Sequence, residues 1–135
     1  MVIDTSALLA ILQDEPERRR FNERIEAAAD RWLSTASLVE ASIVIEARYG
    51  PPGLLALDRL IATADIRLVE VDVAQANVAR TAFSRYGKGR HPAGLNFGDC
   101  FAYALARVRA QPLLFTGGDF DRTDLESAMA AGSSW

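Results

Sequence analysis

Short apolar runs alternate along this chain with longer segments in which apolar residues recur every three or four positions. The short runs are typical of buried strands, and the longer segments are typical of amphipathic helices. The predicted strands cover residues 1–3, 32–33, 66–71 and 113–116. The predicted helices cover residues 5–12, 16–28, 37–49, 54–64, 73–86 and 97–110. Strands that alternate with helices predict an α/β fold built on a mainly parallel sheet.

Proline, glycine and capping residues mark the predicted helix ends. Pro16 suits the first position of the second helix, and the glycines and prolines of residues 50–53 separate the third from the fourth. Asn96 is a preferred capping residue, and Pro112 ends the last helix. Four apolar residues at helical spacing predict the core-facing stripe of that last helix: Phe97, Phe101, Leu105 and Val108.

Length and composition limit the classes of protein that the sequence can encode. With 135 residues, half of them apolar, we expect one domain over residues 1–135 with a single sizeable core. No stretch approaches the roughly 20 apolar residues that span a bilayer. No basic segment precedes the first apolar run, which argues against a signal peptide. We therefore expect a cytoplasmic protein with no membrane partner.

The chain has one cysteine, Cys100, and one histidine, His91. These counts exclude an internal disulfide, a cysteine-rich zinc site and a multi-histidine metal centre within one chain. The formal charge of −3 gives no overall attraction for nucleic acid. A polyanionic partner would therefore have to be attracted by local basic patches.

Four acidic residues that are far apart in the sequence are predicted to meet at one edge of the sheet. Asp4 directly follows the first strand, and Asp119 comes shortly after the last one. Glu40 and Asp99 lie in the first turns of two predicted helices. In right-handed crossovers the helix starts lie at the carboxyl ends of the strands, where open α/β sheets bind ligands.

Asp4 and Glu40 each have an ordinary structural explanation as well. Asp4 could cap the first helix, although Ser6 could cap it instead and leave Asp4 available for a ligand. Ser37 and Glu40 have the spacing of a capping box. Against that, Ile43 and Val44 share the helix face of Glu40, and a carboxylate on an apolar face is costly without a cation or donors.

Asp99 and Asp119 are also compatible with purely local roles. Asp99 comes three residues after Asn96 and suits the positive end of a helix. Asp119 follows two glycines, where aspartate is a common turn residue. Asp121 and Asp124 are close enough in sequence to replace Asp119 as the fourth acid.

Taken together, the four acids point to a metal-dependent reaction. Clustered carboxylates raise one another's pKa unless a cation neutralises them. Oxygen ligands suit a hard divalent ion such as Mg²⁺ or Mn²⁺. Such an ion can activate water and stabilise charge on a phosphodiester. The pattern therefore predicts phosphodiester hydrolysis.

The ordered set Asp4, Glu40, Asp99 and Asp119, with the sequence Asp-Thr-Ser-Ala-Leu after the first strand, resembles the PIN-domain ribonucleases. More narrowly, the chain looks like the VapC toxins of bacterial toxin–antitoxin pairs. Residues 86–100 and 113–120 are especially similar to one VapC subgroup. The likeness extends from Met1 to about Leu125.

This resemblance implies a PIN-like three-layer α/β/α sandwich and an endoribonuclease toxin with one or two Mg²⁺ or Mn²⁺ ions. It implies that Asp4 and Asp99 are the principal metal ligands. It further implies that Glu40 completes the first metal site and that Asp119 is a more variable fourth acid. A hydroxyl at Thr116 is implied to support the site. The substrates of this family are frequently tRNA or ribosomal RNA.

The resemblance also implies partners. We expect a homodimer and a cognate VapB-type antitoxin that occupies the groove of the toxin, in a heterotetramer or a larger complex. The leucines and isoleucine of residues 54–61 could contribute to such a surface, although core packing explains most of them equally well.

A basic loop leads into the last predicted helix. Lys88, Arg90 and His91 could contact the phosphates of an RNA substrate, and Tyr86 could stack on a base. The alternative is an ordinary solvated loop.

Three other functions compete with this interpretation. A haloacid-dehalogenase-like phosphatase needs a second aspartate two residues after Asp4, where this chain has Ser6. A receiver domain could use Asp72, but no lysine stands at a strand end to accompany it. A catalytically silent PIN-like module that binds RNA or a protein remains the alternative, although the complete set of acids argues against it.

Overall fold

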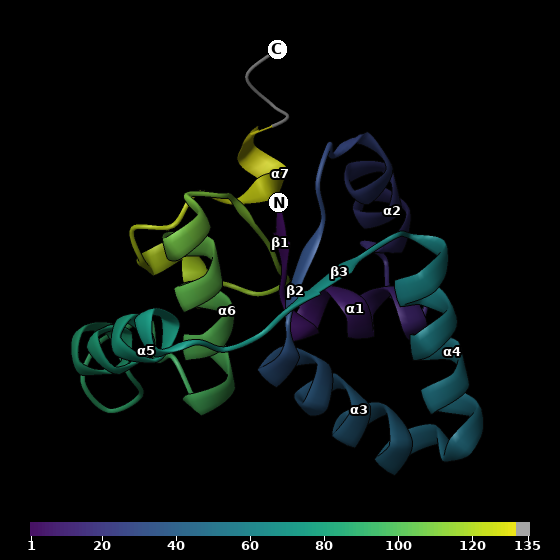
Figure 1. Cartoon of the computed structure of the whole chain (residues 1–135), viewed down its shortest axis with the longest axis horizontal. Helices are drawn as coiled ribbons and strands as arrows, with labels where there is room; N and C mark the ends of the chain where they lie inside the picture. Colours follow the sequence, from purple (N-terminus) through teal and green to yellow (C-terminus); the bar gives the residue numbers. More distant parts are fainter. Residues whose placement is uncertain (132–135) are drawn as a thin grey trace.

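The computed structural model describes residues 1–131, so the last four residues of the predicted domain lie outside the described residues (Figure 1). Four parallel strands form one sheet in the order β3-β2-β1-β4. Their bounds are Val2–Ile3 for β1, Trp32–Ser34 for β2, Arg67–Val69 for β3 and Leu113–Leu114 for β4.

Helices connect the strands and cover both faces of the sheet. In chain order they are α1 (Thr5–Leu12), α2 (Arg18–Ala27), α3 (Thr35–Tyr49), α4 (Pro51–Thr63), α5 (Val73–Tyr86) and α6 (Phe97–Arg109). A short 3₁₀ helix, η1 (Phe120–Arg122), and α7 (Ala128–Ala131) follow β4. Within the described chain, no helix combines the length and the apolar character needed to cross a bilayer. The predicted three-layer α/β/α architecture is confirmed (Figure 1).

Alternating side chains of the central strands divide the core into two halves. Val2 pairs in register with Leu113, and Ile3 pairs with Leu114. Successive residues of a strand point to opposite faces. Val2 and Leu113 therefore pack in the cluster of α5 and α6, and Ile3 and Leu114 pack in the cluster of α1 to α4. Because both faces are covered, strands of two or three residues are enough to anchor the sheet.

The order of the strands creates a switch point between β1 and β4. The chain runs outward from β1 through β2 to β3, and it then returns to place β4 beside β1. Right-handed crossovers consequently put the helices that follow β1 and β2 on one face and the helices that follow β3 on the other. Ligand crevices of open α/β sheets lie at such a point, outside the carboxyl ends of the strands.

Several helix starts differ from the predictions. The third helix begins at Thr35 rather than at residue 37, because Ser34 caps it by accepting a hydrogen bond from the backbone of Ala36 at 3.2 Å. The fourth begins at Pro51 rather than at residue 54. Gly50 has φ +65° and ψ −157°, a conformation almost restricted to glycine, and it is the single residue between α3 and α4. The second helix begins at Arg18, two residues after Pro16.

The predicted core stripe of α6 is wrong at both ends. Phe97 is 77% exposed and Val108 is 44% exposed, whereas the middle of the helix, residues 102–106, is buried. The helix α6 packs against α5 on one side and against the sheet on the other, and its middle residues are the ones that these neighbours bury. Helical periodicity alone does not distinguish a helix enclosed on several sides from one with a single buried face.

Candidate active site

Asp4 occupies the switch point as the N-cap of α1 and is only 4% exposed. Its Oδ2 accepts hydrogen bonds from the backbone N–H of Ser6 at 3.0 Å and from the Ser6 hydroxyl at 2.6 Å. Of the two caps that the sequence allowed, Asp4 rather than Ser6 therefore caps the helix. Both of these hydrogen bonds fall on one oxygen, which leaves Asp4 Oδ1 able to bind a ligand.

The Ser6 hydroxyl links Asp4 to the end of β4. Its oxygen accepts a hydrogen bond from the backbone N–H of Thr116 at 3.0 Å while it donates to Asp4. Ser6 thus joins the two strand ends that border the switch point. Thr116 makes this contact through its amide rather than through the side-chain hydroxyl that the family resemblance emphasises.

Glu40 does not form the capping box that its spacing from Ser37 suggested. The helix starts two residues earlier, and the Ser37 hydroxyl is buried without a hydrogen-bond partner in the described part of the chain. The argument from a shared apolar face is also wrong, because Ile43 is 64% exposed. The buried face of α3 carries Ala41 and Ile45 instead.

Gly98 on α6 makes room for the Glu40 carboxylate. A Cβ atom built at Gly98 would lie 2.6 Å from Glu40 Cδ, far inside van der Waals contact, and would overlap the carboxylate oxygens. The carboxylate of α3 therefore rests directly against the first turn of α6. The absence of a side chain at residue 98 brings Glu40 beside Asp99.

Asp99 forms a capping box with Asn96 at the start of α6. The Asn96 side chain accepts from the Asp99 backbone N–H at 2.9 Å, and Asp99 Oδ2 accepts from the Asn96 backbone N–H at 3.0 Å. Asp99 therefore has the local role that its position predicted. The same hydrogen bond fixes the side chain and leaves its second oxygen able to take a further partner.

The carboxylates influence one another electrostatically. Burial, followed by the charges of Asp99 and Glu40, raises the pKa of Asp4 to about 6, against the lowering effect of the Ser6 hydrogen bonds. Burial also raises the pKa of Asp99, and the charges of Asp119 and Glu40 add to this increase. The four acids are thus gathered at one edge of the sheet. Asp99 interacts electrostatically with each of the other three.

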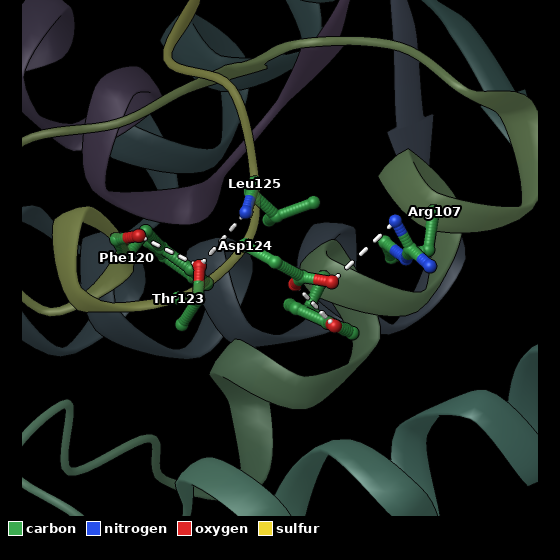
Figure 2. Close-up of polar contacts among 6 residues, drawn as sticks. Arg107, Phe120, Thr123, Asp124 and Leu125 are labelled. Atoms are coloured by element: carbon green, nitrogen blue, oxygen red, sulfur yellow. Dashed lines mark hydrogen bonds and ion pairs between the residues drawn. The ribbon is translucent and has the colours of Figure 1, made fainter.

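Of the acids near the chain end, Asp119 is the one that acts on Asp99. Asp124 is engaged elsewhere, because it accepts a hydrogen bond from the Tyr103 hydroxyl at 2.6 Å and pairs with Arg107 at 3.5 Å (Figure 2). Figure 2 also shows the Thr123 turn that holds this segment, with bonds to Phe120 and Leu125. Asp124 is therefore a structural residue.

The acid cluster carries uncompensated negative charge. None of its four members forms an ion pair with a lysine or arginine within residues 1–131. Over the same residues, no three Asp, Glu, His or Cys side chains stand close enough to enclose a metal ion by themselves. The arrangement is an open group of carboxylates rather than a closed cage.

The basic loop between α5 and α6 is held beside the start of α6. The Lys88 N–H donates to the Leu95 carbonyl at 2.9 Å, and the Leu95 N–H donates to the Tyr86 carbonyl at 3.0 Å. The side chains of Lys88 and Arg90 are exposed. Tyr86 is buried, so the prediction that it stacks on a base is wrong.

His91 packs within this loop rather than projecting from it. Its Nδ1 accepts a hydrogen bond from the Ala93 N–H at 3.0 Å, and its ring contacts the edge of Tyr86 at 5.1 Å between centroids. These contacts give His91 a role in shaping the loop.

Comparison with known proteins identifies the family to which the chain belongs. The family model of the PIN domain matches residues 1–126. The chain belongs to the PIN-domain family. Ribonuclease VapC30 of Mycobacterium tuberculosis is 55% identical over 125 residues, which cover 93% of this chain and 95% of the relative. Ribonuclease VapC of Mycolicibacterium smegmatis is also 55% identical, over 93% of this chain and 97% of its own. This PIN domain thus belongs to the VapC ribonuclease group.

Solved structures share the fold of this PIN domain at low sequence identity. The sarcin-ricin loop cleaving toxin VapC20 of Mycobacterium tuberculosis matches with a TM-score of 0.75 and 16% identity, over 92% of this chain and 95% of its own. The DNA-bound VapBC complex of Salmonella typhimurium matches with a TM-score of 0.66 and 20% identity, over 93% of both chains. These likenesses establish the architecture.

Sequence reasoning missed two residues that shape the site, Ser6 and Gly98. The sequence indicates Ser6 only as an alternative cap, although a hydroxyl two residues after a buried carboxylate is well placed to donate to it. Gly98 gave one signal: a glycine directly before Asp99, in the first turn of a helix, has no role as a helix former.

The first prediction concerns the pH dependence of stability. The folded-state pKa of Asp4 lies above its unfolded value, so the ionised side chain destabilises the fold. Its favourable contribution is complete below about pH 4 and is lost as the pH rises through about 6. Since one pKa unit corresponds to about 1.4 kcal/mol, the cost at neutral pH is on the order of 3 kcal/mol. Asp4→Asn, without divalent cations, should therefore raise the free energy of unfolding at pH 7.5 and should do so less at pH 4.5.

Asp58→Asn is the matched control, because Asp58 is an exposed aspartate outside the cluster. Urea unfolding at the two pH values measures both variants. An equal effect of Asp4→Asn at pH 7.5 and 4.5 would contradict the buried-charge account.

The second prediction tests the contact between Gly98 and Glu40. In a helix, glycine to alanine normally stabilises by about 0.5–1 kcal/mol. Gly98→Ala should not show this gain while Glu40 is present, because the new methyl group displaces the carboxylate. In a Glu40→Ala background the gain should return. A double-mutant cycle by urea unfolding measures this coupling, and equal effects of Gly98→Ala in both backgrounds would refute the contact.

Proposed function

We propose that this PIN domain is an endoribonuclease toxin in which Asp4, Glu40, Asp99 and Asp119 hold a divalent cation and hydrolyse RNA. The observation that carries this proposal is the group of mutually repelling carboxylates at the switch point, without a lysine or arginine partner in the described chain. Such charge is costly to keep buried unless a ligand compensates it. A cation is the ligand that acidic oxygen atoms suit best.

The donor set fits Mg²⁺, or Mn²⁺ in its place. Mg²⁺ keeps several of its waters and is usually held by one or two carboxylates together with substrate phosphates, so an open group suffices. When bound, the ion would supply an activated water and neutralise charge on the phosphodiester. Asp4 would present Oδ1, because Ser6 holds its other oxygen, and Asp99 would present the oxygen that Asn96 leaves available. Glu40 and Asp119 would complete the acidic surroundings.

RNA is the substrate class that we propose, with tRNA or ribosomal RNA as the first candidates. The 55% identical relatives are named ribonucleases, and one structural neighbour is described as cleaving the sarcin-ricin loop. Lys88 and Arg90 are exposed on the loop that leads into α6, where their charges could hold the phosphate backbone near Asp99. Thr116 would support substrate binding at the neighbouring strand end.

We also propose a protein partner of the VapB antitoxin type and a homodimeric toxin, combined in a heterotetramer or a larger complex. Structural neighbours include a toxin–antitoxin complex from Klebsiella pneumoniae and a DNA-bound VapBC. Exposed apolar residues on α3 and α4 support a protein-binding surface there: Val39, Ile43, Tyr49 and Leu55. The other large apolar residues expected to contribute on α4 mostly pack on the core, with Leu57 fully buried.

The third prediction tests the reaction. Asp99→Asn keeps an oxygen and the shape of the side chain but removes its charge, so RNA cleavage should fall on the order of 100-fold or more. Cleavage by the unmodified chain should stop with EDTA and return with Mg²⁺ or Mn²⁺. Both are measured with a labelled RNA in a protein preparation freed of antitoxin.

Asp124→Asn provides the matched control, because Asp124 contacts Tyr103 and Arg107 rather than the acid cluster. It should cleave at the normal rate. Full activity of Asp99→Asn, or cleavage in EDTA, would rule out the proposed mechanism. A folded chain that binds RNA and cleaves none with either ion would favour the catalytically silent module instead.

The fourth prediction concerns Lys88 and Arg90. Replacing both with alanine should weaken RNA binding and flatten its dependence on salt, because each phosphate contact on a single strand contributes about 0.7 to the logarithmic slope. Binding is measured by fluorescence anisotropy at several salt concentrations. The control replaces Arg18 and Arg19 on α2, which form exposed pairs with Asp14 and Glu23. Identical slopes for both double variants would mean that the basic loop does not hold the backbone.

A further inference from the structure

An exposed aromatic residue begins the helix that carries Asp99. Phe97 is largely open to solvent, which is unusual for a phenylalanine at the start of a packed helix. Its ring makes an edge contact with Phe101, with 4.9 Å between centroids and 79° between the planes. The ring is thus supported from beneath while one face remains available.

A cavity of about 520 Å³ lies between α5 and α6 beside this ring. We call it the Phe97 hollow. The small side chains of Ala76 and Ala79 on α5 leave this space. Its walls are almost entirely apolar apart from one arginine, and they also include Arg80, Phe83, Phe97, Cys100 and Phe101. Its volume falls within the range of sites that take small flat ligands.

The surroundings of the Phe97 hollow are basic, although the whole chain is acidic. No aspartate or glutamate occurs between Asp72 and Asp99, whereas this stretch contains Arg80, Arg85, Lys88 and Arg90. Arg80 lines the hollow, and the Arg90 guanidinium lies 5.7 Å from the centroid of Phe83. Aromatic walls with cations at the rim are the combination that binds single-stranded nucleic acid, through base stacking and phosphate contacts.

We propose that the Phe97 hollow receives an unpaired base of the RNA substrate, a short distance along the strand from the phosphodiester that is cut. This proposal rests on the proposed function and adds the form of the substrate. Phe97 and Asp99 lie on different sides of the same helical turn, so a strand that passes over the start of α6 reaches both. Bases within a duplex are stacked on one another, whereas those of loops and bulges can be splayed out onto aromatic rings.

The charge of the rim favours RNA over a second copy of this chain. A twofold pair brings the same surface patch of both copies together, and around this hollow the basic side chains would then face their own counterparts. A polyanion is instead attracted by Arg80 and Arg90. The hollow therefore favours a loop or a single strand. Only unpaired RNA offers a free base face to the aromatic wall together with phosphates for the basic rim.

The experiment compares RNA binding by Phe97 variants in an Asp99→Asn background, which prevents cleavage. Anisotropy with Mg²⁺ measures two probes of the same sequence, an unpaired oligoribonucleotide and its full duplex. Stacking on an aromatic ring contributes about 1–3 kcal/mol per base. Phe97→Ala should therefore weaken binding of the unpaired probe about 5- to 150-fold and leave duplex binding nearly unchanged. Phe97→Trp should retain the affinity.

Val108→Ala is the control for loss of an exposed apolar residue, because Val108 is half-exposed at the other end of α6. Unchanged binding of the unpaired probe by Phe97→Ala would overturn this inference but not the proposed function. So would a Phe97→Ala variant that loses only a dimer, in sedimentation measurements, while its affinity per protomer is kept. If the Asp99→Asn parent binds no RNA, the proposed function fails together with this inference.

Discussion

Asp4 is a buried carboxylate that is repelled by two further carboxylates, Asp99 and Glu40. The hydrogen bonds around Asp4 fix its side chain despite this repulsion. Ser6 donates two hydrogen bonds to one of its oxygens, and the Ser6 hydroxyl is itself fixed by the amide of Thr116. The same residues therefore stabilise the start of α1 and connect β1 to β4. Repulsion among the acids would otherwise push these elements apart. The local hydrogen bonds therefore offset part of the electrostatic cost of placing the acids together.

The short strands matter because of where they end rather than because of how much they bury. The reversal of strand order between β1 and β4 leaves an opening at the carboxyl edge, and α1, α3 and α6 all start there (Figure 1). Each of these helices brings one acid: Asp4 and Asp99 lie at the starts of α1 and α6, whereas Glu40 lies in the second turn of α3 rather than in the predicted first turn. Asp4 and Asp99 each cap the start of their own helix, whereas the Glu40 carboxylate of α3 rests against Gly98 of α6. Fold and site thus depend on the same few turns.

The sequence predicted the sheet, the order of elements and the convergence of the acids, because topology determines which residues reach the carboxyl edge. It did not predict which side of each helix would be covered. Tyr86 was expected to be open and is buried, whereas Phe97 was expected in the core and is open. Periodicity reports which residues share a helix face, and only the neighbouring elements decide whether that face meets protein or solvent. The Glu40 contact was beyond sequence reasoning, because it joins residues 58 positions apart.

The contact between Gly98 and Glu40 restricts which substitutions the chain can accept at these two positions during evolution. A side chain larger than hydrogen at residue 98 and a full-length glutamate at residue 40 exclude each other in the observed arrangement. Neither position can drift freely while the other stays as it is. We therefore expect related sequences to keep both residues or to exchange them together, although the two positions are far apart along the chain.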